Sequence, residues 1–149
     1  MKNYLFILAF AITNNCFAQS DEQKVTERVQ QLFTAMFNGD SIGARSCFTE
    51  KAIMQTIGMD KAGNSVVQTG SIDAFTSFVG KQAKGTADER IKFDGIKIDG
   101  DMALVWTPYE FYYQQKFSHC GVNSFMLFRH KGEWRINYII DTRRKENCN

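Results

Sequence analysis

The C-terminal third of the chain carries a pattern that few folds accommodate. Four consecutive segments alternate in side-chain character: RIKFDGIKI, MALVWTPYEFYYQ, KFSHCGVNSFMLFRH and EWRINYIID. The short turn sequences DGD, QQK and KG mark the junctions between them, and QQK shares its first and last residues with the segments on either side. A period of two, interrupted by turns this short, is typical of antiparallel β-strands joined by hairpins. The pattern therefore predicts one continuous antiparallel meander, against which the rest of the chain must pack.

Helical periodicity precedes this meander. In chain order, the sequence predicts helices at 21–39 and 41–48, a strand pair at 52–59 and 65–70, and a third helix at 72–82. Asn38-Gly39 is a helix stop signal, and Ser71 is a suitable N-cap for the third helix. This order predicts a single α+β domain over residues 19–149, whose sheet curls around its helices and leaves a cleft between them.

The same segments resemble a known superfamily. The stretch LFTAMFNGDSIGARSCFTEKAIM, followed by a meander that ends in GEWRINYIIDTRR, resembles the nuclear transport factor 2-like (NTF2-like, SnoaL-like) superfamily. The segment from TPYEF to KENC resembles its exported bacterial branch labelled putative lumazine-binding. The resemblance implies a cone in which N-terminal helices pack against a strongly curved, mainly antiparallel sheet. The superfamily contains both enzymes and binding domains, so the fold does not choose a function.

The first 18 residues have the outline of a secretory signal peptide. Lys2 precedes an apolar run from Tyr4 to Ile12, and the small residue Ala18 precedes polar sequence. The run is far shorter than the roughly 20 residues that a membrane-spanning helix needs. Lipid attachment at Cys16 is an alternative, although TNNC lacks the usual preceding residues. We therefore expect a secreted or periplasmic protein that has no membrane attachment after signal removal.

Charge and motifs exclude several classes of function. The chain has 18 basic and 16 acidic residues, a formal charge of +2, and no basic stripe, which argues against nucleic acid as a partner. It contains no phosphate loop, no dinucleotide fingerprint and no metal-ligand cluster. We therefore expect neither a cofactor nor a metal.

Three cysteines remain after signal removal, so at most one intramolecular disulfide can form. Cys120 lies on a strand, and a tail that folds back after the last strand could bring Cys148 to it. Cys47 would then be a small buried apolar residue on the second helix. The alternative, a nucleophilic pair of Cys120 with His119, needs a bulge or an odd loop, because adjacent strand residues face opposite ways.

Hairpin turns at Gln115-Lys116 and Lys131-Gly132 would fix which side chains share a face of the sheet. With these turns, the pocket face carries an apolar floor and a polar end, as ligand pockets do. Its predicted ligand-binding residues are Trp106, Tyr112, Asn123, Phe125 and Tyr138. The opposite face carries exposed aromatic residues and suits a homodimer of the kind common in the superfamily.

Glu110 and His119 are the predicted catalytic candidates on the pocket face. A carboxylate beside an imidazole can hold the tautomer of the ring and move a proton. The alternative is a solvated pair at the rim of the sheet. Farther along the chain, Asp141, Arg143 and Arg144 have two alternative roles. They could form ion pairs that hold the C-terminal tail in place, or the arginines could bind an anionic ligand through two N–H groups.

Three functional hypotheses follow. The first is a binding domain for a small, partly apolar ligand, with no defined reaction. The second is a cofactor-independent isomerase, dehydratase or hydrolase that uses Glu110 and His119 as an acid-base pair. The third is a protein-interaction domain whose pocket is filled by its own side chains. The sequence does not name the ligand.

Overall fold

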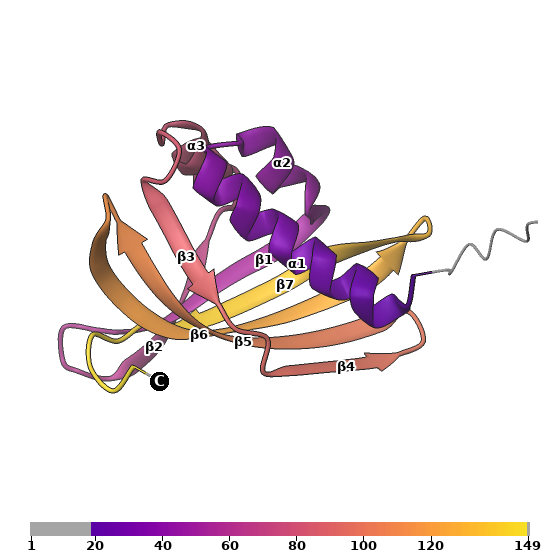
Figure 1. The fold of residues 1–149 in the computed structure, drawn as a ribbon. Helices are drawn as coiled ribbons and strands as arrows, with labels where there is room; N and C mark the ends of the chain where they lie inside the picture. The colour runs from indigo at the N-terminus through magenta and orange to yellow at the C-terminus, as the bar shows by residue number, and fades with distance from the viewer. Residues whose placement is uncertain (1–18, 149) are drawn as a thin grey trace, which may run out of the picture.

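A computed structural model describes residues 19–148, and the predicted signal peptide with Cys16 lies outside the described residues. Three helices lie over the concave face of one curved sheet, which confirms the predicted α+β cone (Figure 1). The elements are α1 (Asp21–Asn38), α2 (Ser41–Ser46), β1 (Phe48–Met59), β2 (Ser65–Gly70), α3 (Ile72–Gly80), β3 (Ala87–Ile91), β4 (Gly95–Asp99), β5 (Met102–Tyr113), β6 (Lys116–His130) and β7 (Glu133–Thr142).

Local sequence sets the ends of α1. The Ser20 hydroxyl accepts a hydrogen bond from the Gln23 backbone, and the Gln23 side chain accepts one from the Ser20 backbone. This reciprocal capping box satisfies two N–H groups that the first turn leaves free. Gly39 ends the helix in the left-handed conformation, with φ of 69°. A fixed α1 presents one continuous apolar side to the sheet.

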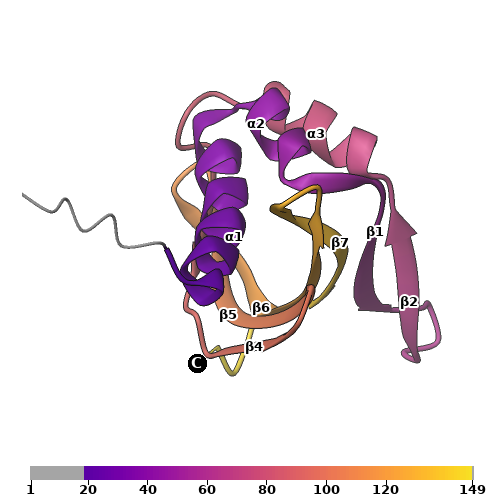
Figure 2. The same ribbon diagram turned by 90° about the vertical axis from the view of Figure 1, so that its right-hand side faces the viewer.

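The sheet runs in the order β2-β1-β7-β6-β5-β3, and β4 also pairs with β5. The pairing of β1 with β7 is parallel, and the other strand pairs are antiparallel. The strands curve strongly, so that β1 and β2 stand on the opposite side of the concavity from β5 (Figure 2). The concave face that results holds a cavity between the sheet and the helices.

The segment RIKFDGIKI, predicted as one strand, is divided into β3 and β4. The break lies opposite Pro108, whose carbonyl accepts a hydrogen bond from Lys92 N at 2.9 Å. In an antiparallel ladder the N–H and C=O of a residue point to the same neighbour, and proline has no N–H. The edge strand therefore loses its regular pairing at this point, which sequence alternation alone did not reveal.

The β5–β6 hairpin corrects the predicted pocket face. Its turn is Gln114-Gln115, one residue earlier than predicted, and a register shift follows between Phe111 and Tyr112. A slip of one residue moves every side chain of a strand to the other face. The concave face of β5 therefore carries Ala103, Val105, Thr107, Tyr109 and Phe111.

The β6–β7 hairpin follows the prediction only near its turn. His130 pairs with Glu133 and Leu127 with Ile136, as a turn at Lys131-Gly132 requires. A bulge then shifts the register between Met126 and Leu127, so that Met126 pairs with Tyr138. Beyond the bulge, Ile139 and Asp141 face inward, and Tyr138 and Ile140 face outward.

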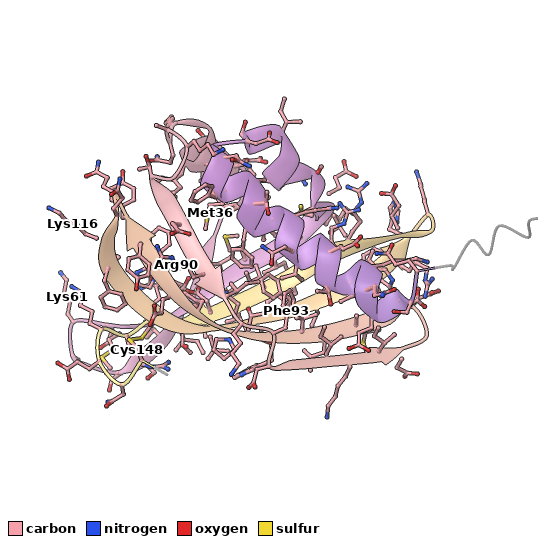
Figure 3. All side chains as sticks on the ribbon, viewed as in Figure 1. Met36, Lys61, Arg90, Phe93, Lys116 and Cys148 are labelled. Carbon is pink, nitrogen blue, oxygen red and sulfur yellow. A yellow bond between two sulfur atoms is a disulfide. The ribbon has the colours of Figure 1, made fainter. Side chains whose placement is uncertain are left out.

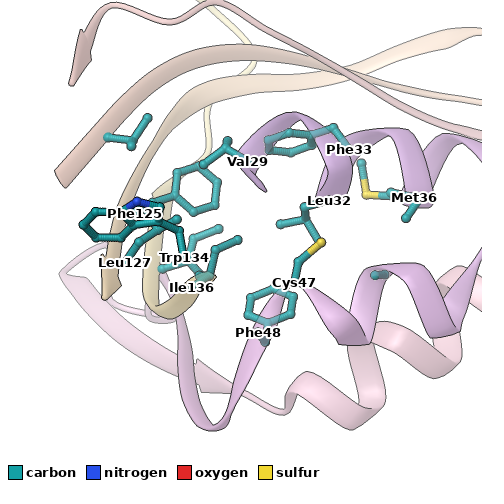
Figure 4. Close-up of a cluster of buried hydrophobic side chains, with 14 of the residues drawn as sticks. Val29, Leu32, Phe33, Met36, Cys47, Phe48, Phe125, Leu127, Trp134 and Ile136 are labelled. Atoms are coloured by element: carbon teal, nitrogen blue, oxygen red, sulfur yellow. The ribbon is translucent and has the colours of Figure 1, made fainter. Parts of the chain in front are cut away.

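The core fills the half of the cone near that turn. Val29, Leu32 and Phe33 of α1 pack toward the sheet (Figure 4). The facing residues are Phe125, Leu127, Trp134 and Ile136, and all four are at most 2% exposed. Phe33 and Phe125 meet edge to face, with ring centroids 6.0 Å apart. This packing fixes α1 over β6 and β7.

The C-terminal tail returns along β6. Cys120 and Cys148 form a disulfide, with their Cα atoms 5.8 Å apart (Figure 3). Arg144 exchanges two backbone hydrogen bonds of 2.8 Å with Cys120, which aligns the tail with the strand. Cys47 is a buried free thiol. The tail is therefore tied to the strand that carries His119.

Candidate functional site

A cavity of about 310 Å³ lies between the helices and the concave face of the sheet. Its helical wall is apolar, and its opposite end, built by the sheet and the start of the tail, is polar. The apolar wall is formed by Leu32, Phe33, Met36, Phe75 and Phe78, and the polar end by Glu89, Tyr109, His119, Asn123, Asp141 and Arg143. Small-molecule sites usually combine an apolar wall with a few polar groups that point toward the same region of the cavity.

The structure brings only part of the predicted site together. His119 and Asn123 line the cavity. Phe125 is on the correct face but is fully buried in the core. Three predictions are wrong because of the register shifts: Trp106, Tyr112 and Tyr138 all lie on the convex face.

Glu110 also lies on the convex face, so the predicted pairing of Glu110 with His119 is wrong. Its carboxylate accepts a hydrogen bond of 2.8 Å from the Tyr112 hydroxyl. The Arg90 guanidinium stacks over the Tyr112 ring at 4.1 Å. These contacts make Glu110 part of a surface cluster, and the carboxyl groups that reach the cavity belong to Glu89 and Asp141.

Of the two carboxylates that line the cavity, Asp141 accepts more hydrogen bonds than Glu89. Its Oδ2 accepts from the Tyr109 hydroxyl at 3.1 Å and from Arg143 Nε at 2.7 Å, and its Oδ1 accepts from the Thr56 hydroxyl. The Tyr109 hydroxyl also lies 2.9 Å from the Thr142 carbonyl oxygen. Burial, with Asp141 nearby, raises the pKa of Tyr109, so the hydroxyl remains a donor. Of the two alternatives for this segment, the contacts support docking, since Arg143 is paired with Asp141.

Gly121 makes this cluster possible. It pairs with Tyr109 on the concave face, and a Cβ at this position would collide with the Thr142 carbonyl and the Tyr109 ring. Only glycine lets the phenol cross the strand to reach its acceptors. An isolated glycine inside a strand pattern signals such a close approach, but the prediction of the site did not use that signal.

Glu89 was missed by the sequence reasoning, which placed no functional residue on the edge strand. It pairs with Phe111, so its side chain faces inward, where Asn123 Nδ2 donates to its Oε1 at 2.8 Å. Burial raises the pKa of Glu89 to about 7, Asp141 adds to the shift, and the bond from Asn123 opposes it. This carboxyl therefore titrates near neutral pH, inside the cavity.

His119 sits between two aromatic rings. Its centroid is 5.7 Å from that of Tyr109 and 5.1 Å from that of Phe111, and its Nδ1 is 3.0 Å from the Ser118 hydroxyl. Burial, followed by the charge of Arg143, lowers its pKa, so the ring is neutral at pH 7. The alternative Cys120–His119 nucleophile is wrong, because Cys120 faces away and is held in the disulfide.

Within residues 19–148, no three histidine, cysteine, aspartate or glutamate side chains gather closely enough to hold a metal ion. In the same part of the chain, no helix has both the length and the apolar character needed to cross a membrane.

Comparison with known proteins places this geometry in a family. A model of the family described as Putative lumazine-binding matches residues 20–138. No curated protein matches the chain.

Several solved structures share the fold. An NTF2-like protein of unknown function from Shewanella baltica is 14% identical and superimposes with a TM-score of 0.64, covering 87% of this chain and 100% of its own. An NTF-2 like protein of unknown function from Silicibacter pomeroyi is 21% identical, with a TM-score of 0.62 and coverage of 81% and 93%. A domain with a cystatin-like fold from Nostoc punctiforme is 18% identical, with a TM-score of 0.65 and coverage of 85% and 79%. At these identities the likeness concerns the fold alone.

Proposed function

The chain belongs to the family described as Putative lumazine-binding, within the NTF2-like superfamily, and from that premise we propose that its cavity binds a small, partly apolar ligand. The observation that carries the proposal is the division of one 310 Å³ cavity into an apolar wall and a polar end. Burial of an apolar ligand body against the helices would supply affinity, and the polar groups would supply orientation. The family description names a heterocycle, and a flat ring system fits this division.

Native mass spectrometry of the protein purified from its own host tests the proposal. We expect a bound small molecule that denaturation releases. Met36→Trp places a large side chain in the cavity wall and should abolish the extra mass, whereas Met126→Trp on the convex face should retain it. If both variants retained the bound molecule equally, binding in the cavity would be contradicted. It would also be contradicted if the native protein carried no ligand and bound none of the heterocycles added to it.

Glu89 favours a second candidate function, proton transfer on the bound ligand. A general base works best when its pKa lies near the working pH, and burial brings the pKa of Glu89 to about 7. In this version of the enzyme hypothesis, Glu89 replaces the convex-face residue Glu110. With the released molecule as substrate, Glu89→Gln should abolish turnover but leave binding intact. Loss of binding alone would favour the purely binding domain.

Export is a proposal that the structure supports indirectly. The disulfide between Cys120 and Cys148 is of a kind that persists in oxidising compartments. We expect a secreted or periplasmic protein that begins at Gln19. N-terminal sequencing of the protein from its own host would test this, and an intact Met1 would contradict it.

The convex face supports a further proposal, a homodimer. Leu104, Trp106 and Met126 lie there side by side, and they are 39%, 46% and 40% exposed. Burial of these side chains against a second copy would remove apolar surface from water. Sedimentation of the mature protein should give a dimer mass that Trp106→Glu reduces to that of a monomer. A monomeric native protein would contradict the proposal.

A further inference from the structure

The two carboxyl groups of the cavity differ in how their charge is compensated. Asp141 has three donors, and one of them is the guanidinium of Arg143, 2.7 Å away. Glu89 has one neutral donor, Asn123, and within the described residues it forms no ion pair. Glu89 is only partly exposed to solvent, and a carboxylate in such a position without an ion-pair partner is costly. Glu89 is therefore the group of this cavity that a positive ligand would stabilise most.

The Asn123–Glu89 hydrogen bond also sets the geometry of that end. The amide nitrogen of Asn123 is committed to Glu89 Oε1, which leaves Glu89 Oε2 and the Asn123 carbonyl oxygen without a side-chain donor among the described residues. Both side chains line the cavity. They therefore offer adjacent acceptors, a pattern that matches a ligand edge with two N–H donors.

The apolar part of the cavity is rich in aromatic side chains. Phe33, Phe75 and Phe78 come from the helices, and Phe111 lies beside Glu89 across the β3–β5 pair. Phenyl faces accommodate a flat ring system and also favour a cation over an anion. The cation of Arg143 offsets the charge of Glu89 only in part. It lowers the pKa of Glu89 against the larger effect of burial, but its Nε is bound to Asp141 and its Nη2 lies 3.3 Å from the Thr56 hydroxyl.

We propose that the cavity selects a planar aromatic ligand with a cationic, amidine-type edge, whose two N–H groups bind Glu89 and the carbonyl oxygen of Asn123. The inference rests on the proposed binding function and narrows its ligand class. An amidinium is flat, positively charged and carries two N–H donors, so that one N–H can bind the free Oε2 of Glu89 and the other the carbonyl oxygen of Asn123. A neutral or anionic ligand of the same shape would leave the charge of Glu89 uncompensated.

The pH dependence has a defined sign. The groups near the Glu89 carboxyl are Asn123 and His119 of β6, Tyr109 of β5, and Asp141 and Arg143 at the end of β7. Tyr109 and His119 are neutral at pH 7, and Asp141 is paired with Arg143. Because burial holds the pKa of free Glu89 at about 7, an amidinium must expel its proton below that pH. Affinity for the cation should therefore rise from pH 5.5 to 8, and binding at pH 6 should release protons.

Three probes on one planar frame test the proposal by calorimetry: 2-naphthamidine, 2-acetylnaphthalene and 2-naphthoate. We expect the amidine to bind about tenfold or more tighter than the other two, the effect of a charge-assisted hydrogen bond. Glu89→Gln should abolish this preference and the dependence on pH, and the matched convex-face variant Glu110→Gln should retain both. The pH series on the native protein gives the same test without a substitution.

The outcomes separate this inference from the function on which it rests. Equal or tighter binding of the ketone or the naphthoate would overturn the cationic ligand class but leave the binding function standing. A preference for the amidine that survives in Glu89→Gln would also overturn it. Failure of all three probes to bind would overturn both proposals.

Discussion

The two halves of the concave face are built from the same strands, but apolar side chains fill one half and a cavity with a polar end occupies the other. Near the β6–β7 turn, Phe125, Leu127 and Trp134 fill the space under α1 completely. At the other end of those strands, His119, Asn123 and Asp141 line a hollow with a polar end. The bulge in the β6–β7 pairing lies between Leu127 and Met126, within the filled half. The filled half accounts for the stability of the fold, and this frees the hollow half to carry carboxyl groups that no stable core would tolerate.

The largest effect on stability is expected in the filled half. Phe125→Ala removes a fully buried ring that meets Phe33, and it should lower the free energy of unfolding by about 3–5 kcal/mol. The matched change on the convex face, Leu104→Ala, should cost clearly less, because that side chain is already 39% exposed. Denaturant unfolding of both variants measures the difference, and equal losses would show that the two faces are not distinct.

The disulfide should have the next largest effect. Cys148→Ser opens a link between residues that are 28 positions apart, which should cost roughly 2–4 kcal/mol. It also releases the tail that carries Arg143, so ligand binding should weaken together with stability. Thermal unfolding and binding under oxidising and reducing conditions would measure both effects. If ligand binding were unchanged after reduction of the disulfide, the tail would not contribute to binding in the hollow half.

Gly121→Ala should act mainly on the hollow half. The added methyl group would displace the Tyr109 ring and the Thr142 carbonyl, at a cost of about 1–3 kcal/mol in unfolding free energy. We expect binding to be lost in a protein that still folds. Gly132→Ala in the exposed β6–β7 turn, where φ is 82° and no atom lies near the added methyl group, is a control for a glycine substitution that destabilises the fold away from the cavity. Binding that survives in Gly121→Ala would contradict the assigned role of the Tyr109–Asp141 cluster.

The smallest effect concerns pH. Since burial raises the pKa of Glu89 from 4.5 to about 7, the folded state holds a proton that the unfolded state has lost within this range. The contribution of this group is full below pH 4.5 and disappears as pH rises to about 7, a loss on the order of 1–3 kcal/mol. Glu89→Gln should remove this dependence, and Glu110→Gln should not. Stability curves of native protein and Glu89→Gln that run parallel between pH 4.5 and 7 would argue against a buried Glu89.

The fold could be predicted from the sequence because its signals are local. The helical periodicity of residues 21–38 and the alternation of the meander are visible in short windows, and the superfamily resemblance is confirmed. The candidate site depended on register instead. One residue in the position of the Gln114-Gln115 turn, together with the register shift between Phe111 and Tyr112, decided whether Glu110 or Glu89 faces the cavity. The bulge in the β6–β7 pairing decided the face of Tyr138. Bulges arise from tertiary packing, and alternation does not encode them.

The most direct test of the contrast between the filled and hollow halves is a crystal structure of the mature protein grown with 2-naphthamidine at pH 8. We predict that the ring system lies against Phe75 and Phe111, with the amidine within hydrogen-bond distance of Glu89 and Asn123, and that the packing around Phe125 is unchanged. A probe bound on the convex face beside Trp106, or a hollow half filled by the protein's own side chains, would contradict the account.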